Sequence, residues 1–233
     1  MVSIFDLFFT SRDNISDKWE QYLAIYDAEL KSWAGRDVDV LEVGVQNGGS
    51  MSVWSGYFGS GSKIVGLDID ERVALLSHPE NVRLAIADAT DAARLDEVLG
   101  DETFDLIIDD GSHMSADVLR SFALLYPRLR PGGKYVIEDL HCSYWPEYGG
   151  GVGSANSSVE YLKRFVDVLH ADHIPALADL DLDRALLAEC LAPEGWRIDT
   201  GHPAFNIYAI PFDPGVEGSL HDFMLADAAL MDV

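Results

Sequence analysis

The sequence has few basic residues. It carries 16 Lys and Arg against 40 Asp and Glu, so the formal net charge of the 233-residue chain is −24. The basic side chains occur singly or in loose pairs and form no run along the sequence. Nucleic acid and anionic membrane surfaces bind proteins mainly through Lys and Arg. We therefore expect neither as a partner.

Cysteine and long apolar runs are also scarce. Cys142 and Cys190 lack metal-type spacing, which indicates a reduced, cytoplasmic setting without a disulfide framework. The apolar start, Ile4 to Phe9, has no basic region before it, contains Asp6 and is too short to cross a bilayer. We interpret it as an amphipathic entry segment. No other run is long enough for a transmembrane helix, so no membrane association is expected.

The sequence does contain five alternations of a short apolar run with a helical segment. Apolar, β-branched runs that are bounded by turn residues are typical of buried parallel strands. These runs cover residues 38–43, 63–67, 82–87, 104–109 and 135–137. Their alternation with helices predicts an α/β fold, a Rossmann-like, doubly wound and mostly parallel sheet.

Helices are expected before this sheet and a hairpin after it. Apolar side chains three or four apart in residues 17–33 predict an amphipathic helix that ends at Gly35, within an N-terminal helical cover of residues 1–35. A further helix is expected over residues 157–170. Residues 196–198 and 205–210 predict a C-terminal antiparallel hairpin, and Leu220 with Phe223–Leu225 predict a short helix. No linker divides the chain, so we expect a single domain over residues 1–233.

Two predicted strands end at paired carboxylates. Asp109 and Asp110 follow the fourth run, and Glu138 and Asp139 follow the fifth. One such pair is often a helix cap or a solvated loop. However, open α/β sheets bind ligands at the carboxyl ends of their strands. Paired strands lie about 4.8 Å apart, so the two pairs would repel each other, and a divalent cation would relieve that repulsion.

His113 lies three residues after Asp110, where a helix is expected to begin. A lone histidine is more commonly exposed or capping. The positive end of a helix disfavours the protonated imidazole and so keeps the base form available. The position of His113 beside the acids therefore favours a general base.

A glycine-rich turn follows the first predicted strand. Gly44 and Gly48 would let the backbone approach a ligand closely, with the next helix starting at that ligand. Asp68 lies about twenty residues further on, where a carboxylate binds ribose hydroxyls in nucleotide-binding βαβ units. The alternative for Asp68 is an N-cap of a helix that starts near Glu71. Asp88 ends the third run.

These stretches resemble the donor-binding half of class I S-adenosyl-L-methionine (SAM) dependent methyltransferases. The similar residues are Leu41 to Gly44 with Gly48, then Asp68, then Asp88. The resemblance implies that SAM is the cofactor, with its methionine end near Glu42, its ribose at Asp68 and its adenine amino group at Asp88. The cofactor-binding residues that it implies are Glu42, Gly44, Gln46, Gly48, Ser50, Asp68, Asp88 and Asp109.

Residues 108–113, 136–140 and 143–150 resemble the metal-dependent macrolide-sugar O-methyltransferases, the mycinamicin and macrocin type. Residues 17–19 with Tyr22 and Tyr26 also look like the helix that covers the cofactor in that family. The resemblance implies Mg²⁺ held by Asp110, Glu138 and Asp139, with His113 as the base that acts on a sugar hydroxyl. It implies a small-molecule glycoside as substrate, either a natural product or a glycan. The apolar start and the tail near Phe223 suggest a homo-oligomer, a tetramer by analogy with the family.

Two alternatives stay open. A catechol-type O-methyltransferase also uses a metal at these strand ends, although the Glu138-Asp139 pair and His113 favour the sugar substrate. A non-catalytic SAM-binding subunit is the alternative from another class, and the intact acid cluster argues against it.

Residues 140–156 are aromatic and then glycine-rich, which predicts a lid loop.

Overall fold

The computed structural model describes residues 3–10, 14, 16–163, 206–209 and 223–227. The chain divides into two compact units, Met1–Ile108 with Arg128–Lys134, and Asp109–Pro127 with Tyr135–Val233. The single domain expected over residues 1–233 stays a prediction. Within the described residues, no helix combines the length and the apolar character needed to cross a bilayer.

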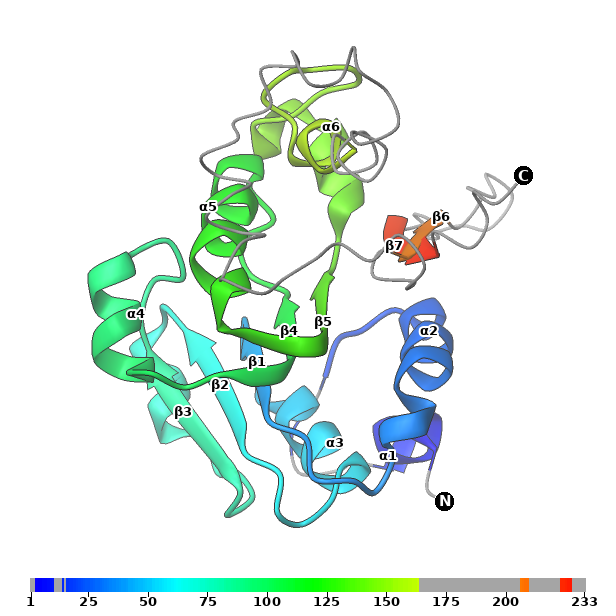
Figure 1. Ribbon diagram of the computed structural model, residues 1–233, viewed down its shortest axis with the longest axis vertical. Helices are drawn as coiled ribbons and strands as arrows, with labels where there is room; N and C mark the ends of the chain where they lie inside the picture. The colour runs from blue at the N-terminus through cyan, green and yellow to red at the C-terminus, as the bar shows by residue number, and fades with distance from the viewer. Residues whose placement is uncertain (1–2, 11–13, 15, 164–205, 210–222, 228–233) are drawn as a thin grey trace. The chain divides into compact units, whose positions relative to one another are not determined.

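The fold is a mixed α/β fold with a five-stranded parallel sheet (Figure 1). Its strands lie in the order β3-β2-β1-β4-β5. They are β1 (Val40–Val43), β2 (Ile64–Asp68), β3 (Val82–Ile86), β4 (Phe104–Asp109) and β5 (Leu129–Ile137). The five predicted strands are thus confirmed; β4 has the predicted bounds, whereas β5 starts earlier than predicted. The strand order reverses between β1 and β4, and open α/β sheets bind ligands at such a reversal.

The central strands are buried along their whole apolar runs. All four residues of β1 are buried, and Leu106, Ile107 and Ile108 of β4 have no exposed surface. Such runs fit strands that are covered on both faces. The parallel register pairs Val40 with Ile64 and Val43 with Leu67, so the residues after β1 lie beside the end of β2.

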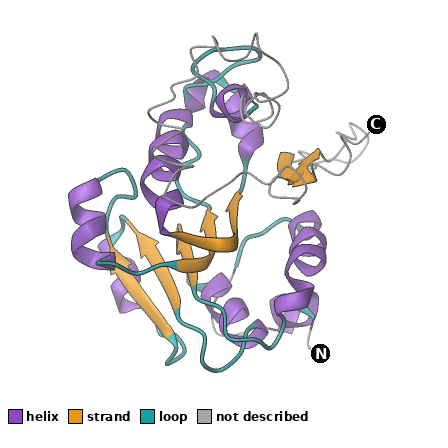
Figure 2. Cartoon of the chain, in the orientation of Figure 1, coloured by secondary structure: helices purple, strands orange, loops and turns teal. Residues whose placement is uncertain are grey.

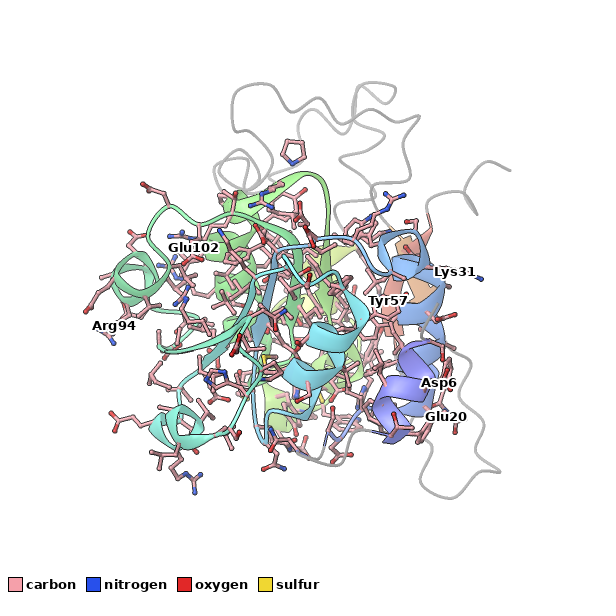
Figure 3. The ribbon with its side chains drawn as sticks, turned by 90° about the horizontal axis from the view of Figure 1, so that it is seen from below. Asp6, Glu20, Lys31, Tyr57, Arg94 and Glu102 are labelled. Carbon is pink, nitrogen blue, oxygen red and sulfur yellow. The ribbon has the colours of Figure 1, made fainter. Side chains whose placement is uncertain are left out.

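The first unit holds the helices that precede and connect these strands. They are α1 (Ile4–Thr10), α2 (Glu20–Leu30), α3 (Gly49–Tyr57) and α4 (Ala92–Leu99), with 3₁₀ turns η1 (Lys31–Trp33) and η2 (Glu71–Leu75). The helix predicted over residues 17–33 is confirmed as α2 and η1, and Gly35 follows with a φ of +73°. Tyr22 and Tyr26 of α2 are buried, whereas Lys31 at its end is exposed at the outer edge of the unit (Figure 3).

The second unit contains α5 (Ser115–Leu125) and α6 (Ser158–Leu162), with 3₁₀ turns η4 (Leu140–Tyr144) and η5 (Pro146–Tyr148) between them (Figure 2). A further turn, η3 (Tyr126–Arg128), follows α5. On α5, Val118, Phe122 and Leu125 are buried. The helix predicted over residues 157–170 is present as α6, and its part from residue 164 on lies outside the described residues.

Near the C-terminus, β6 (Asn206–Ala209) pairs antiparallel with β7 (Phe223–Asp227). The predicted hairpin segment 196–198 lies outside the described residues. The short helix expected at Phe223–Leu225 is wrong, because these residues belong to β7. A short apolar run is compatible with either structure, and here pairing with β6 gives a strand.

Candidate active site

Three predicted site residues come together in the second unit. One ligand atom each of Asp110, His113 and Asp139 lies within 4.8 Å of the other two. The Nε2 atom of His113 is 3.6 Å from Oδ2 of Asp139 and 3.9 Å from Oδ1 of Asp110. All three side chains are partly exposed, at 21–23%. We call these three residues the acid–histidine cluster.

The backbone that presents this cluster is unusual. Among the described residues, the non-glycine residues with positive φ are Gln46 (+49°), His113 (+57°) and Asp139 (+53°). An L-residue in this left-handed region costs about 1–2 kcal/mol, and such residues gather at functional sites. Two of the three belong to the acid–histidine cluster, and the third lies in the glycine-rich turn after β1.

The alternative of His113 as a helix cap is not supported by the hydrogen bonds. The N-cap position of α5 is Met114. The hydroxyl of Ser112 accepts a hydrogen bond from the Met114 N–H and donates one to Asp117 in the first turn. Ser112 thus forms the side-chain hydrogen bonds just before α5, whereas the imidazole of His113 lies near the two acids.

Glu138 and Asp109 are not members of the cluster. The backbone N–H of Glu138 donates to the carbonyl of Asp109 at 2.9 Å, which joins the two strand ends. Both side chains are buried, and the hydroxyl of Ser121 donates to the carboxylate of Asp109. Burial, opposed by hydrogen bonds from Ser121 and Gly111, raises the pKa of Asp109 to about 6. The predicted roles of Glu138 toward a metal and of Asp109 toward the cofactor stay predictions.

The donor atoms of the cluster fit a divalent cation in part. Carboxylate oxygens from Asp110 and Asp139 suit Mg²⁺, which prefers oxygen ligands and keeps several waters. An imidazole nitrogen suits softer ions, so His113 fits the role of a base beside the ion better than that of a Mg²⁺ ligand. An all-oxygen set of three residues would need Glu138 as well.

Sequence reasoning gave no role to His141. Its Nδ1 lies 4.0 Å from Oδ1 of Asp139, and its ring packs edge-on against Trp145 at 5.1 Å. The Sγ atom of Cys142 is 3.8 Å from His141 Nε2. The only sequence signal was its position two residues after Asp139. The imidazole is buried and can restrict how the Asp139 carboxylate turns.

The predicted lid loop is held at its base by three serines. The hydroxyls of Ser143 and Ser158 are 2.5 Å apart, and Ser157 Oγ donates to the Ser143 carbonyl at 2.8 Å. All three are buried, whereas Val152 at the tip is 87% exposed. A Cβ on Gly150 would lie 1.9 Å from the Ser143 carbonyl oxygen, so only glycine fits there. Opening of residues 140–156 as a lid stays a prediction.

In the first unit, the glycine-rich turn is tied to Asp68. Oδ2 of Asp68 accepts hydrogen bonds from the N–H groups of Val45 (2.8 Å) and Gln46 (3.2 Å). The N-cap of η2 is Asp70, not Asp68, so the capping alternative for Asp68 is not what the structure shows. Gly48 has a φ of +76° and precedes α3. This geometry holds a turn of backbone N–H groups at the start of a helix, as nucleotide-binding turns do.

The other predicted cofactor residues lie on the same unit. Ser50 is buried in the first turn of α3. Asp88 is exposed after β3, and its Oδ1 accepts hydrogen bonds from the N–H and the hydroxyl of Thr90. A Cβ at Gly48 would lie 3.3 Å from both Asn14 Nδ2 and Leu76 Cδ1, so the turn is closely covered. Positive φ angles, a tethered turn and carboxylates after β2 and β3 together fit the binding of a nucleoside such as that of SAM.

Glu42 lies at the middle of β1 and is fully buried. Its Oε1 is 3.3 Å from Nζ of Lys18, and its Oε2 accepts a hydrogen bond from the indole N–H of Trp54. The ring of Tyr26 packs edge-on against Trp54. The sequence pointed to Glu42, and the resemblance associated residues 17–19 with the cofactor, but neither indicated that Lys18 pairs with Glu42.

Comparison with known proteins shows what this fold and these residues resemble. Residues 41–140 match the family model of a methyltransferase domain. This stretch begins in β1 and ends just after Asp139.

More particular similarities are to sugar O-methyltransferases. Over 176 residues the chain is 41% identical to 8-demethyl-8-alpha-L-rhamnosyl tetracenomycin-C 2'-O-methyltransferase of Streptomyces olivaceus, covering 70% of this chain and 45% of that protein. Over 164 residues it is 37% identical to mycinamicin VI 2''-O-methyltransferase of Micromonospora griseorubida, covering 65% and 40%. The chain thus spans less than half the length of these curated relatives.

A solved structure of a methyltransferase is also similar to this chain. The MycE methyltransferase of the mycinamycin biosynthetic pathway, in complex with Mg and SAH, superposes with a TM-score of 0.62 at 27% identity. The match covers 91% of this chain and 51% of that one. The expected resemblance to this group of enzymes is confirmed.

Proposed function

We propose that this chain is a Mg²⁺-dependent O-methyltransferase that transfers a methyl group from SAM to a sugar hydroxyl of a glycosylated natural product or glycan. The observation that carries the proposal is the acid–histidine cluster, which places two carboxylates and an imidazole within 4.8 Å of one another after the ends of β4 and β5. The similarity to sugar O-methyltransferases supports the choice of acceptor.

The donor is assigned to residues of the first unit. When bound, SAM supplies a methyl group on a positively charged sulfur. We assign Glu42 and the turn from Gly44 to Gly48 to its methionine end, Asp68 to the ribose hydroxyls and Asp88 to the adenine amino group. Asp68 already accepts two turn N–H groups through Oδ2, so it would fix the turn and the ribose together.

The acceptor is assigned to residues of the second unit. When bound, Mg²⁺ supplies a Lewis acid that makes a sugar hydroxyl more acidic. Asp110, Asp139 and Glu138 would together hold the Mg²⁺ ion through carboxylate oxygens. His113 would accept the hydroxyl proton on Nε2, and the carboxylates of Asp110 and Asp139 beside that atom would stabilise the imidazolium formed.

Two further features belong to the same proposal. Residues 140–156 would close over the acceptor. The homo-oligomer predicted from the apolar start is the second; within that start Phe9 of α1 is 66% exposed, whereas Ile4 is buried. A monomer mass in light scattering at micromolar concentration would contradict that assembly.

The test is methyl transfer measured by mass. The protein is incubated with SAM, Mg²⁺ and a panel of rhamnosides and macrolide glycosides, with a simple catechol in a parallel arm. We expect a gain of one methyl group on a glycoside, abolished by EDTA. Methyl gain only on the catechol would mean that the acceptor is a catechol and not a sugar. No gain on any acceptor despite bound SAM would refute the methyltransferase activity.

Variants separate the metal from the donor. Asp110→Asn and Asp139→Asn should abolish Mg²⁺-dependent turnover while SAM affinity in calorimetry stays at the wild-type value. Asp101→Asn, at an exposed turn position in the first unit, is the matched control and should change neither. Glu138→Gln decides whether the buried third acid belongs to the ligand set, because only a ligand variant should raise the Mg²⁺ concentration needed for half-maximal rate.

A further inference from the structure

Lys18 and Glu42 form an ion pair inside the first unit. Nζ of Lys18 lies 3.3 Å from Oε1 of Glu42, and the two side chains are only 4% and 1% exposed. Removing two charges from water is costly unless further hydrogen bonds satisfy them. Trp54 supplies one such bond to the other carboxylate oxygen. A pair this deep is weak evidence for stability, so a functional reason for it is worth seeking.

The position of the pair points to that reason. Glu42 lies two residues before Gly44, at the start of the glycine-rich turn. Asn14, four residues before Lys18, lies against Gly48 at the other end of that turn, and its amide donates to the Ser77 carbonyl at 3.0 Å. Of the residues before α2, Asn14 therefore lies beside the glycine-rich turn, and Lys18 lies beside β1, the strand that leads into it.

The chemistry of the pair is complementary to an amino acid. The methionine end of SAM carries one ammonium and one carboxylate. Glu42 can accept from the ammonium, but alone it would repel the carboxylate. An ammonium group has three N–H donors, so Lys18 can contact Glu42 and a ligand carboxylate at the same time.

We propose that Lys18 binds the carboxylate of the methionine end of SAM, while Glu42 binds its ammonium. The inference rests on the proposed function, since it requires SAM as the donor. It adds a residue from before α2 to the cofactor site, so that the N-terminal segment recognises the cofactor directly. The competing explanation is structural: Lys18 only neutralises Glu42 and holds that segment in place.

The test uses two ligands that differ in the carboxylate alone. Calorimetry compares S-adenosyl-L-homocysteine with S-adenosyl-3-thiopropylamine, which keeps the amine and lacks the carboxylate. The wild type should prefer the first by about 10- to 100-fold, as expected for a hydrogen bond between charged groups. In Lys18→Met this preference should fall to near one, and Lys18→Arg should restore part of it. Lys31→Met, at the exposed lysine in Figure 3, should keep the wild-type preference.

Each outcome bears on one proposal. If Lys18→Met binds both ligands more weakly by the same factor, or keeps the wild-type preference, Lys18 does not bind the carboxylate. If Lys18→Met fails to fold because Glu42 is left buried without a cation, the neutral pair Lys18→Met with Glu42→Gln takes its place and should show the same lost preference. If the folded wild type binds neither ligand, the proposed donor itself is wrong, and the assignment of Lys18 falls with it.

Discussion

The left-handed backbone conformation of His113 predicts that substitutions there affect stability and catalysis differently. Replacing His113 by alanine or by glycine removes the same imidazole, so the lost contacts with Asp110 and Asp139 cancel when the two variants are compared. What differs is the backbone, because glycine reaches a φ of +57° without the clash that a Cβ causes. His113→Gly should therefore be more stable than His113→Ala.

The size of this difference follows from the geometry. A left-handed L-residue costs about 1–2 kcal/mol, and glycine loses more entropy on folding, which offsets part of the gain. We expect the free energy of unfolding of His113→Gly to exceed that of His113→Ala by about 1 kcal/mol. Urea unfolding at pH 8 measures this difference in the free energy of unfolding, and EDTA keeps metal ions from binding to the folded protein. The matched control is Glu97 in α4, where the order should reverse because glycine costs about 1 kcal/mol relative to alanine inside a helix.

Turnover should behave differently from stability. Both His113 variants should lose roughly 10²–10⁴-fold in rate, the usual worth of a general base, while SAM affinity stays unchanged. If His113→Gly were more stable than the wild type but inactive, the native histidine would be kept for its imidazole at a cost in stability. Equal stability of the two variants would refute the backbone argument, and near-wild-type single-turnover rates at saturating Mg²⁺ would refute the base role.

Two further predictions concern the strands of the sheet. Arg130 donates to carboxylate oxygens of Asp39 (2.7 Å) and Asp105 (2.8 Å), which joins the beginnings of three strands. Because its side chain is 38% exposed, Arg130→Met should lower the free energy of unfolding by only about 1–2 kcal/mol. An unchanged urea midpoint would contradict this. Because the pKa of Asp109 is raised from 3.8 to about 6, the folded protein keeps a proton that the unfolded chain releases, so stability should fall as the pH rises through that interval. Asp109→Asn should flatten that fall in unfolding measured in EDTA, and a pH slope identical to the wild type would show that another group causes it.

Local sequence pattern was enough to predict the strands and most of the helices described. The β4 run of β-branched and apolar residues, bounded by charged residues and a glycine, forms a strand wherever it can be buried on both faces. The same pattern placed Asp109, Asp110, Glu138 and Asp139 at strand ends, because a strand stops where its apolar run stops. These features depend on neighbouring residues only, and the printed sequence contains that information.

Which side chains meet was decided by the tertiary structure. Of the adjacent Glu138 and Asp139, which follow the end of β5, only Asp139 joins Asp110 in the cluster, and Asp139 does so from a left-handed backbone conformation with a φ of +53°. The left-handed turn at His113 brings its imidazole to the same place, and nothing in the local sequence requires that conformation. Likewise, Lys18 and Glu42 are separated in the sequence by the whole of α2, yet their side chains lie 3.3 Å apart in the folded chain. Contacts of this kind follow from strand register and helix packing, which the local sequence pattern alone does not specify.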